Sequence, residues 1–138
     1  MTFKGENMKK YTVYILLIFA FVGCVSKEIV KPSEPPNFDV NTASGLYEEA
    51  KFYLKFKDYG YAQRSFATIV EDFPEDALAD DAQFMVAEIL SNPKNLNQDL
   101  QSAIDEYKSL VDNYPDSPFI KKAQKKISEL ERSLKNLK

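Results

Sequence analysis

Cys24 is the residue whose chemistry and position are most specific in this sequence, because it is the only cysteine. The sequence contains no His, which excludes an imidazole base, a Ser-His or Cys-His nucleophile and a His metal ligand. A single cysteine also excludes an internal disulfide and a CxxC zinc or redox site. The pattern therefore favours a protein that is not an enzyme and that needs no cofactor and no metal.

Acidic residues are concentrated in the middle of the sequence, where paired carboxylates could in principle bind calcium or cleave a glycoside. Residues 71–116 contain twelve acids and two bases, whereas residues 117–138 contain seven bases and two acids. The EF-hand spacing is absent, and a glycosidase acid needs a desolvated pocket. Both runs are therefore interpreted as solvated helix faces. The net charge of −3 argues against a nucleic-acid partner.

The N-terminal residues have the pattern of an export signal. Lys9 and Lys10 precede the apolar run Val13–Val22, which is too short for the roughly twenty residues of a transmembrane helix. An ordinary cleaved signal peptide would leave a free thiol at Cys24. The run Phe21-Val22-Gly23-Cys24 resembles a bacterial lipobox, although Phe21 stands where Leu is usual. The resemblance implies that residues 1–23 are a lipoprotein signal peptide and that Cys24 is lipidated.

Residues 24–41 are predicted to be the lipidated Cys followed by a Pro-rich tether. Pro32, Pro35 and Pro36 lie among Ser, Glu and Lys, without a helical or strand period. Such a segment extends by ~3.1 Å per residue, so the seventeen residues after Cys24 reach on the order of 50 Å. In lipoproteins of this kind an Asp after the Cys tends to retain the protein at the inner membrane. Val25 in that place implies an anchor in the outer membrane, with the protein facing the periplasm.

Two stretches of the sequence, Tyr61–Gln83 and Ser102–Gln124, align without gaps at a spacing of 41 residues. Small, aromatic and Pro residues recur at the same places. The matching pairs are Ala62 with Ala103, Phe66 with Tyr107, Ile69 with Leu110, and Pro74 with Pro115. Their spacing is that of one buried stripe on a helix, and each Pro is expected to end its helix.

The same reasoning predicts partner helices around these stretches. Leu46, Ala50 and Tyr53 indicate a helix from about Thr42 to Lys57, closed by Asp58-Tyr59-Gly60. A further helix begins near Leu78 and ends before Pro93. Ser117 and Pro118 are typical of a helix start, with Ser as the N-cap. The last helix has apolar residues at heptad spacing and is expected to cap the fold, leaving Leu130 and Leu134 partly buried.

The pattern resembles the tetratricopeptide repeat, a helix-turn-helix unit. Six of its signature positions are occupied at the standard spacing, by Leu46, Ala50, Tyr53, Ala62, Phe66 and Pro74. The paired Phe-Pro and Tyr-Pro followed by Ala-Gln are most similar to repeats of the BamD-type and YbgF-type bacterial envelope proteins. The resemblance covers about residues 42–138. It implies an all-α fold: a short solenoid of antiparallel helical hairpins, with about two and a half repeats and five helices.

The resemblance also implies a function, that of a membrane-tethered adaptor that binds other envelope proteins or peptide segments, for example in outer-membrane protein assembly or envelope maintenance. In this family the first helix of each pair lines a concave groove. Carried over one by one, the groove positions are Tyr47, Lys51, Lys55, Asp81, Phe84, Glu88, Lys122, Lys125 and Arg132. The alternative function is a small accessory subunit that docks into a larger envelope complex or forms a homo-oligomer through its C-terminal helix.

Overall fold

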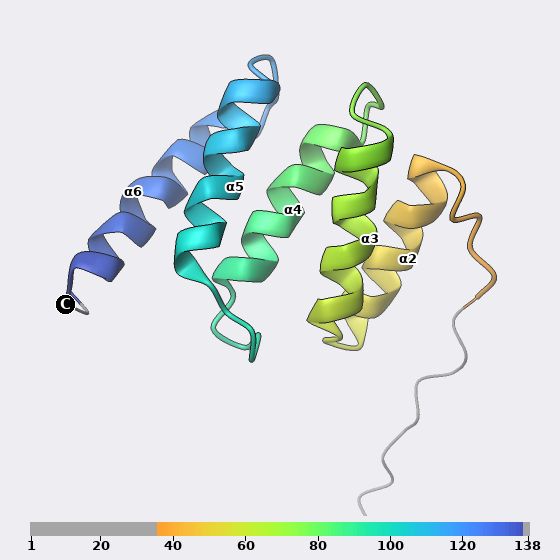
Figure 1. Ribbon diagram of the computed structural model, residues 1–138, viewed down its shortest axis with the longest axis horizontal. Helices are drawn as coiled ribbons and strands as arrows, with labels where there is room; N and C mark the ends of the chain where they lie inside the picture. Colours follow the sequence, from red (N-terminus) through yellow and green to blue (C-terminus); the bar gives the residue numbers. More distant parts are fainter. Residues whose placement is uncertain (1–35, 137–138) are drawn as a thin grey trace, which may run out of the picture. The chain divides into compact units, whose positions relative to one another are not determined.

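Residues 36–136 of the computed structural model form five α-helices and no strand. In chain order these are α2 (Ala43–Lys55), α3 (Tyr59–Asp72), α4 (Ala79–Ser91), α5 (Leu100–Asn113) and α6 (Ile120–Asn136). Each helix packs against the next one along the chain, and consecutive helices run in opposite directions (Figure 1). The predicted all-α class is confirmed for this range. The signal segment 1–23, Cys24 and the tether as far as residue 35 lie outside the described residues.

Three helices begin at a side chain that accepts a hydrogen bond from the first turn. Thr42 Oγ1 accepts from the Gly45 N–H at 3.1 Å and caps α2. Asp58 Oδ1 caps α3 through the Tyr61 N–H at 3.3 Å, and Asp99 Oδ1 caps α5 through the Ser102 N–H at 2.9 Å. Such a cap contributes roughly 0.5–2 kcal/mol, because a helix start leaves N–H groups without intrahelical partners.

The helix boundaries recur at an interval of 41 residues. α3 and α5 begin and end at equivalent positions, and both end immediately before a Phe-Pro or Tyr-Pro pair. The connecting turns are also alike: Asp76 Oδ1 accepts from the Leu78 N–H at 2.9 Å, and Ser117 Oγ accepts from the Phe119 N–H at 3.2 Å. Side-chain acceptors at matched positions, Asp76 and Ser117, therefore produce the same turn twice.

Two of the expected boundaries are wrong in detail. Ser117 holds the turn before α6 rather than capping the helix, which begins at Ile120. Of Asp58, Tyr59 and Gly60, only Asp58 takes part in closing α2, through its N–H; its side chain caps α3, and the other two residues form the first turn of α3. The chain reverses one residue earlier, at Lys57.

Aromatic and small residues of the repeated stripe form the core. Phe66 and Tyr107 are both fully buried, and Ala62 and Ala103 are buried beside them. Phe66 belongs to a cluster between α2, α3 and α4, whereas Tyr107 belongs to one between α4, α5 and α6. The expectation that Phe66 and Tyr107 are buried is confirmed. Leu130 and Leu134 are partly buried, also as expected, and Leu130 contacts both clusters.

Among the described helices, none combines the length and the apolar character that crossing a bilayer demands.

The turn between α2 and α3 depends on a residue in an unfavourable conformation. Lys57 has φ of 61°, the only positive φ among the described residues. The Asp58 N–H donates to the Tyr53 carbonyl and the Lys57 N–H to the Leu54 carbonyl, both at 2.9 Å, which is the Schellman pattern. Glycine normally occupies this place because its missing Cβ removes the steric cost.

We therefore expect Lys57→Gly to raise the free energy of unfolding by up to about 1 kcal/mol, the relief of strain being partly offset by the greater entropy of the unfolded chain. Urea denaturation followed by circular dichroism measures the change. Lys55→Gly is the matched control, because Lys55 is in the last turn of α2, and there glycine should lower stability by roughly 0.5–1 kcal/mol. A Lys57→Gly protein less stable than wild type would contradict this account of the turn.

Candidate protein-binding face

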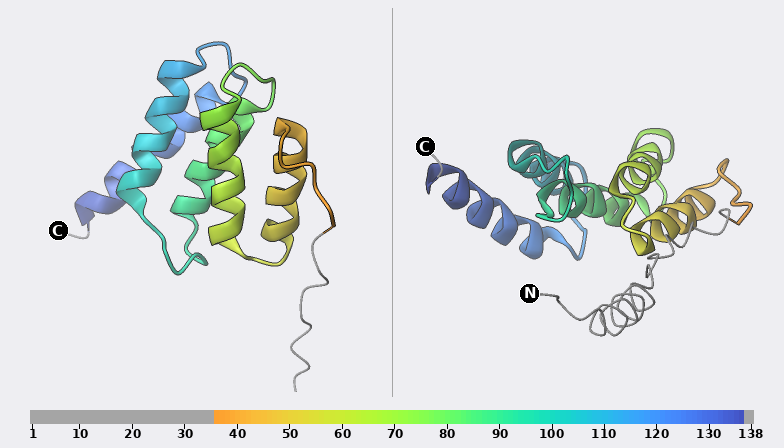
Figure 2. Two further views of the ribbon diagram at one scale, coloured as in Figure 1. Left: turned by 45° about the vertical axis from the view of Figure 1, so that its right-hand side comes forward. Right: turned by 90° about the horizontal axis from the view of Figure 1, so that it is seen from below.

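Helices α2, α4 and α6 lie side by side. α4 contacts α2 through Tyr47 and Asp81, and it contacts α6 through Phe84 and Lys122. Seen from below in Figure 2, α3 and α5 lie on one side of the layer, and α2, α4 and α6 lie on the other. The side formed by α2, α4 and α6 carries the residues that the sequence resemblance assigned to a groove, and it is called the candidate face below.

Tyr47 and Asp81 join α2 to α4 at one end of the candidate face. The Tyr47 hydroxyl donates to Asp81 Oδ2 at 2.5 Å, and its ring lies edge-on to Phe66 with centroids 5.3 Å apart. Burial, and then the hydrogen bond to Asp81, raises the pKa of Tyr47 well above its usual value. The hydroxyl is therefore a neutral donor that fixes the two helices, and only part of the ring remains open to a partner.

Phe84 is buried, so its predicted place in an open groove is wrong. Its side chain is 2% exposed and stacks on Phe119 with ring centroids 4.9 Å apart. The ring also packs against Tyr107 at 5.5 Å. Because α4 is the central helix, neighbours on both sides cover it. The exposed residue next to Phe84 is Lys122, whose Nζ lies 4.3 Å from the centre of the Phe84 ring.

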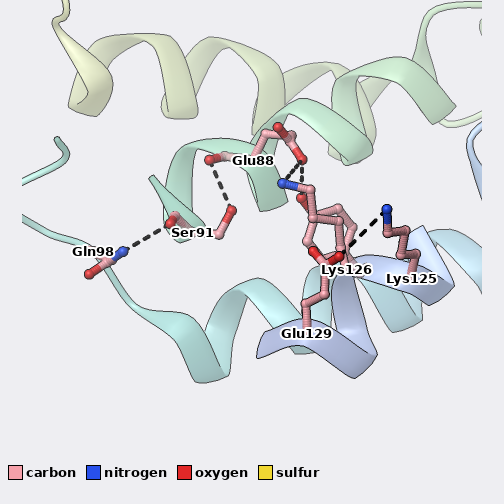
Figure 3. Close-up of polar contacts among 7 residues, drawn as sticks. Glu88, Ser91, Gln98, Lys125, Lys126 and Glu129 are labelled. Carbon is pink, nitrogen blue, oxygen red and sulfur yellow. Dashed lines mark hydrogen bonds and ion pairs between the residues drawn. The ribbon is translucent and has the colours of Figure 1, made fainter. Parts of the chain in front are cut away.

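Glu88 joins α4 to the two helices that follow it. Its Oε1 accepts from the Tyr107 hydroxyl at 2.5 Å and pairs with Lys126 Nζ at 3.2 Å (Figure 3). Burial, and then the Glu88 hydrogen bond, raises the pKa of Tyr107 far above its usual value. The Glu88 carboxylate is thus used inside the domain, and less of it is available to a ligand than the sequence resemblance suggested.

The remaining predicted residues are exposed lysines and one arginine. Lys51 lies on α2, with Nζ 2.9 Å from Glu48 Oε1 and 5.6 Å from the centre of the Tyr47 ring. Lys125 pairs loosely with Glu129 of its own helix at 3.8 Å. Lys55 and Arg132 are exposed on α2 and α6. Among the described residues, no hydrogen bond or ion pair joins Lys55 or Arg132 to another residue of the candidate face.

The sequence resemblance did not include Lys126, which contributes to the candidate face. Lys126 lies one helical turn after Lys122, so a residue spacing of four could have indicated it. Its ion pair with Glu88 crosses from α6 to α4 and holds the last hairpin against the middle of the domain. The candidate face therefore consists of a half-buried tyrosine and a row of lysines over internally paired carboxylates.

The Glu106 carboxyl group on α5 lies in a hollow of about 80 Å³ between α3, α4 and α5, away from the candidate face. Burial raises the pKa of Glu106, and the hydrogen bond from Gln83 opposes the shift. A carboxyl with a raised pKa is a typical catalytic acid. This hollow has room for only a few waters and does not fit a sugar ring. Residues 36–136 also contain no group of three or more acidic residues arranged to hold a metal ion.

No protein-family model matches this sequence, and a search of curated proteins found no significant match.

Proposed function

We propose that this protein is a lipid-anchored adaptor of the bacterial cell envelope, without enzymatic activity, whose candidate face binds a segment of another envelope protein. In this proposal the helices form a tetratricopeptide-like solenoid, with Cys24 anchored in the outer membrane and the domain facing the periplasm. Support for the solenoid comes from helix bounds and turn hydrogen bonds that recur at 41 residues. Support for the anchor comes from the lipobox-like sequence.

One observation carries the binding proposal: α2, α4 and α6 lie side by side, so that Lys51 over the Tyr47 ring of its own helix and Lys122 over the Phe84 ring of α4 are on one face. Both lysines are exposed. With Phe84 buried, aromatic anchoring reduces to the open part of Tyr47. Recognition then depends more on charge than the sequence suggested, and the favoured ligand is a segment that places acidic groups opposite the lysines.

The test is the double substitution Lys51→Glu and Lys122→Glu, assayed by crosslinking in intact cells and quantification of the captured proteins. We expect at least about a tenfold loss of the specific partner, equivalent to about 1.4 kcal/mol, because charges opposite the acidic groups become repulsive. The melting temperature should change little, since both side chains are exposed.

The matched control is Arg64→Glu with Lys108→Glu, which makes the same change of charge on α3 and α5. Capture by the control should resemble wild type. Equal losses in both variants would show that only net charge matters, and the binding proposal would then be wrong. Unchanged capture by the Lys51→Glu, Lys122→Glu protein would place binding elsewhere.

The second candidate function is docking or self-association through α6. Only Ala123 of its seventeen residues is fully buried, while Ile127 and Leu130 are half-buried at the edge of the core. A docking subunit predicts stable co-purification of a complex that survives the Lys51→Glu, Lys122→Glu substitution. Self-association predicts a dimer in analytical ultracentrifugation.

A further inference from the structure

Two connections meet at one end of the helices, the lower end in Figure 1: the turn between α2 and α3 and the longer loop between α4 and α5. Residues of both connections line a single shallow hollow. The exposed large apolar and basic side chains that line it are Phe56 and Lys57 from the turn, and Lys94 and Leu96 from the loop. These four residues are called the loop tip below.

The loop holds Leu96 out in solvent. Leu96 is 101% exposed, yet its neighbour Asn95 is 6% exposed and fixes the loop from inside. The Asn95 amide donates to the Ile89 carbonyl at 3.0 Å, and its Oδ1 accepts from the Asn97 N–H at 3.0 Å. An ordered loop that presents a whole leucine side chain leaves that apolar surface available for a partner. Phe56, 38% exposed, adds apolar surface beside it.

The hollows at the two ends of the helices differ in charge. Asp58 also lines this hollow, and Asp99 follows the loop in sequence; both cap helices, α3 and α5, so the N–H groups of those helix starts compensate their carboxylates. Lys57 and Lys94 are exposed. The hollow at the opposite end of the helices is lined by four acids and no base: Glu75, Asp76, Asp80 and Asp116.

We propose that the loop tip rests on an anionic lipid surface, with Leu96 and Phe56 entering the boundary between headgroups and acyl chains and Lys57 and Lys94 among the headgroups. Lysines flanking exposed apolar residues are the combination that binds anionic interfaces, and the acidic end would then point away from the membrane. The proposal rests on the anchoring proposed above. So small a contact is weak by itself and needs the high effective concentration that an anchor provides.

The test uses the absence of tryptophan from the sequence, which makes an introduced tryptophan the sole reporter. The full chain carrying Leu96→Trp is purified from membranes and reconstituted into vesicles of phosphatidylglycerol and phosphatidylethanolamine with brominated acyl chains. Since bromine quenches tryptophan at short range, we expect loss of most of the emission and a blue shift. Ala77→Trp, an exposed position in the turn before α4, is the control and should keep its emission.

A charge variant tests the lysines. Adding Lys57→Glu and Lys94→Glu to the Leu96→Trp chain should restore most of the emission, whereas Lys121→Glu with Lys125→Glu should not. Vesicles of brominated phosphatidylcholine alone should quench the Leu96→Trp chain weakly. Equal quenching in both lipids, or no quenching in the anionic vesicles, would overturn the proposal.

Flotation of the same vesicles separates the two proposals. A chain that does not float with either lipid contradicts the anchor, and therefore the proposed function. A chain that floats while its tryptophan at the loop tip remains unquenched contradicts only the contact of the loop tip.

Discussion

Phe66→Ala is expected to lower the free energy of unfolding by roughly 3–5 kcal/mol, most of the stability of a domain of this size. The Phe66 side chain is fully buried between α2, α3 and α4, with the Tyr47 ring against its edge. Truncation removes the apolar contacts and leaves a cavity that the surrounding helices cannot close. Urea denaturation followed by circular dichroism at two protein concentrations would measure the loss.

The matched control is Phe56→Ala, the same chemical change at a side chain that is 38% exposed. Its cost should stay below about 1 kcal/mol, because little apolar surface is removed from the interior. Tyr107→Phe is a further control, since it keeps the ring and removes only the hydroxyl bonded to Glu88. Similar stabilities for Phe66→Ala and Phe56→Ala would contradict the core described above.

Much of this fold could be predicted because its signals are local. α3 and α5 end two residues before Pro74 and Pro115, since the residue before a proline is driven out of the α region. The buried positions of Phe66 and Tyr107 follow from helical periodicity and from their place in the repeat. The end of α2 could not be predicted in the same way, because Lys57 has a positive φ, a conformation that glycine usually adopts.

The candidate face was harder to predict because it depends on contacts between residues far apart in the sequence. The burial of Phe84 depends on Phe119, which comes from the turn before α6. The groove positions taken from the sequence resemblance are correct only if the groove helix leaves one side free, but α4 is covered by helices on both sides. The pairing of Tyr47 with Asp81 likewise depends on side-chain rotamers, and helical spacing carries no information about these.

For the lysines of the candidate face, the sequence predicts exposure correctly but does not predict contacts with other helices. Lys51 and Lys122 are exposed, in keeping with their assignment to an outward surface. Lys122 of α6 lies over the Phe84 ring of α4 because the two helices pack together, whereas Lys51 lies over the Tyr47 ring of its own helix, four residues before it. Periodicity therefore separates inside from outside and indicates neighbours within one helix, whereas contacts between helices come only from the tertiary structure.

Cys24→Ala is expected to abolish lipid attachment and to release the protein from membranes washed in high salt. Each methylene of an acyl chain contributes about 0.8 kcal/mol to membrane binding, so loss of the acyl chains removes the dominant contact. The loop tip alone should not retain the protein, because salt near 1 M shortens the screening length to about 3 Å and weakens the lysine contacts. Metabolic labelling with an alkyne fatty acid measures attachment, and fractionation after the wash measures release.

Val25→Ala is the control, since it alters the neighbouring residue and keeps the thiol. It should incorporate the label and remain in the membrane fraction. The apolar run Val13–Val22 is too short to span the bilayer, so a signal segment left uncleaved in the Cys24→Ala protein should not substitute for the lipid. Incorporation of the fatty acid by the Cys24→Ala protein would show that another residue is acylated. An unlabelled wild-type chain that stays in the washed membranes would mean that something other than a lipid on Cys24 holds it there.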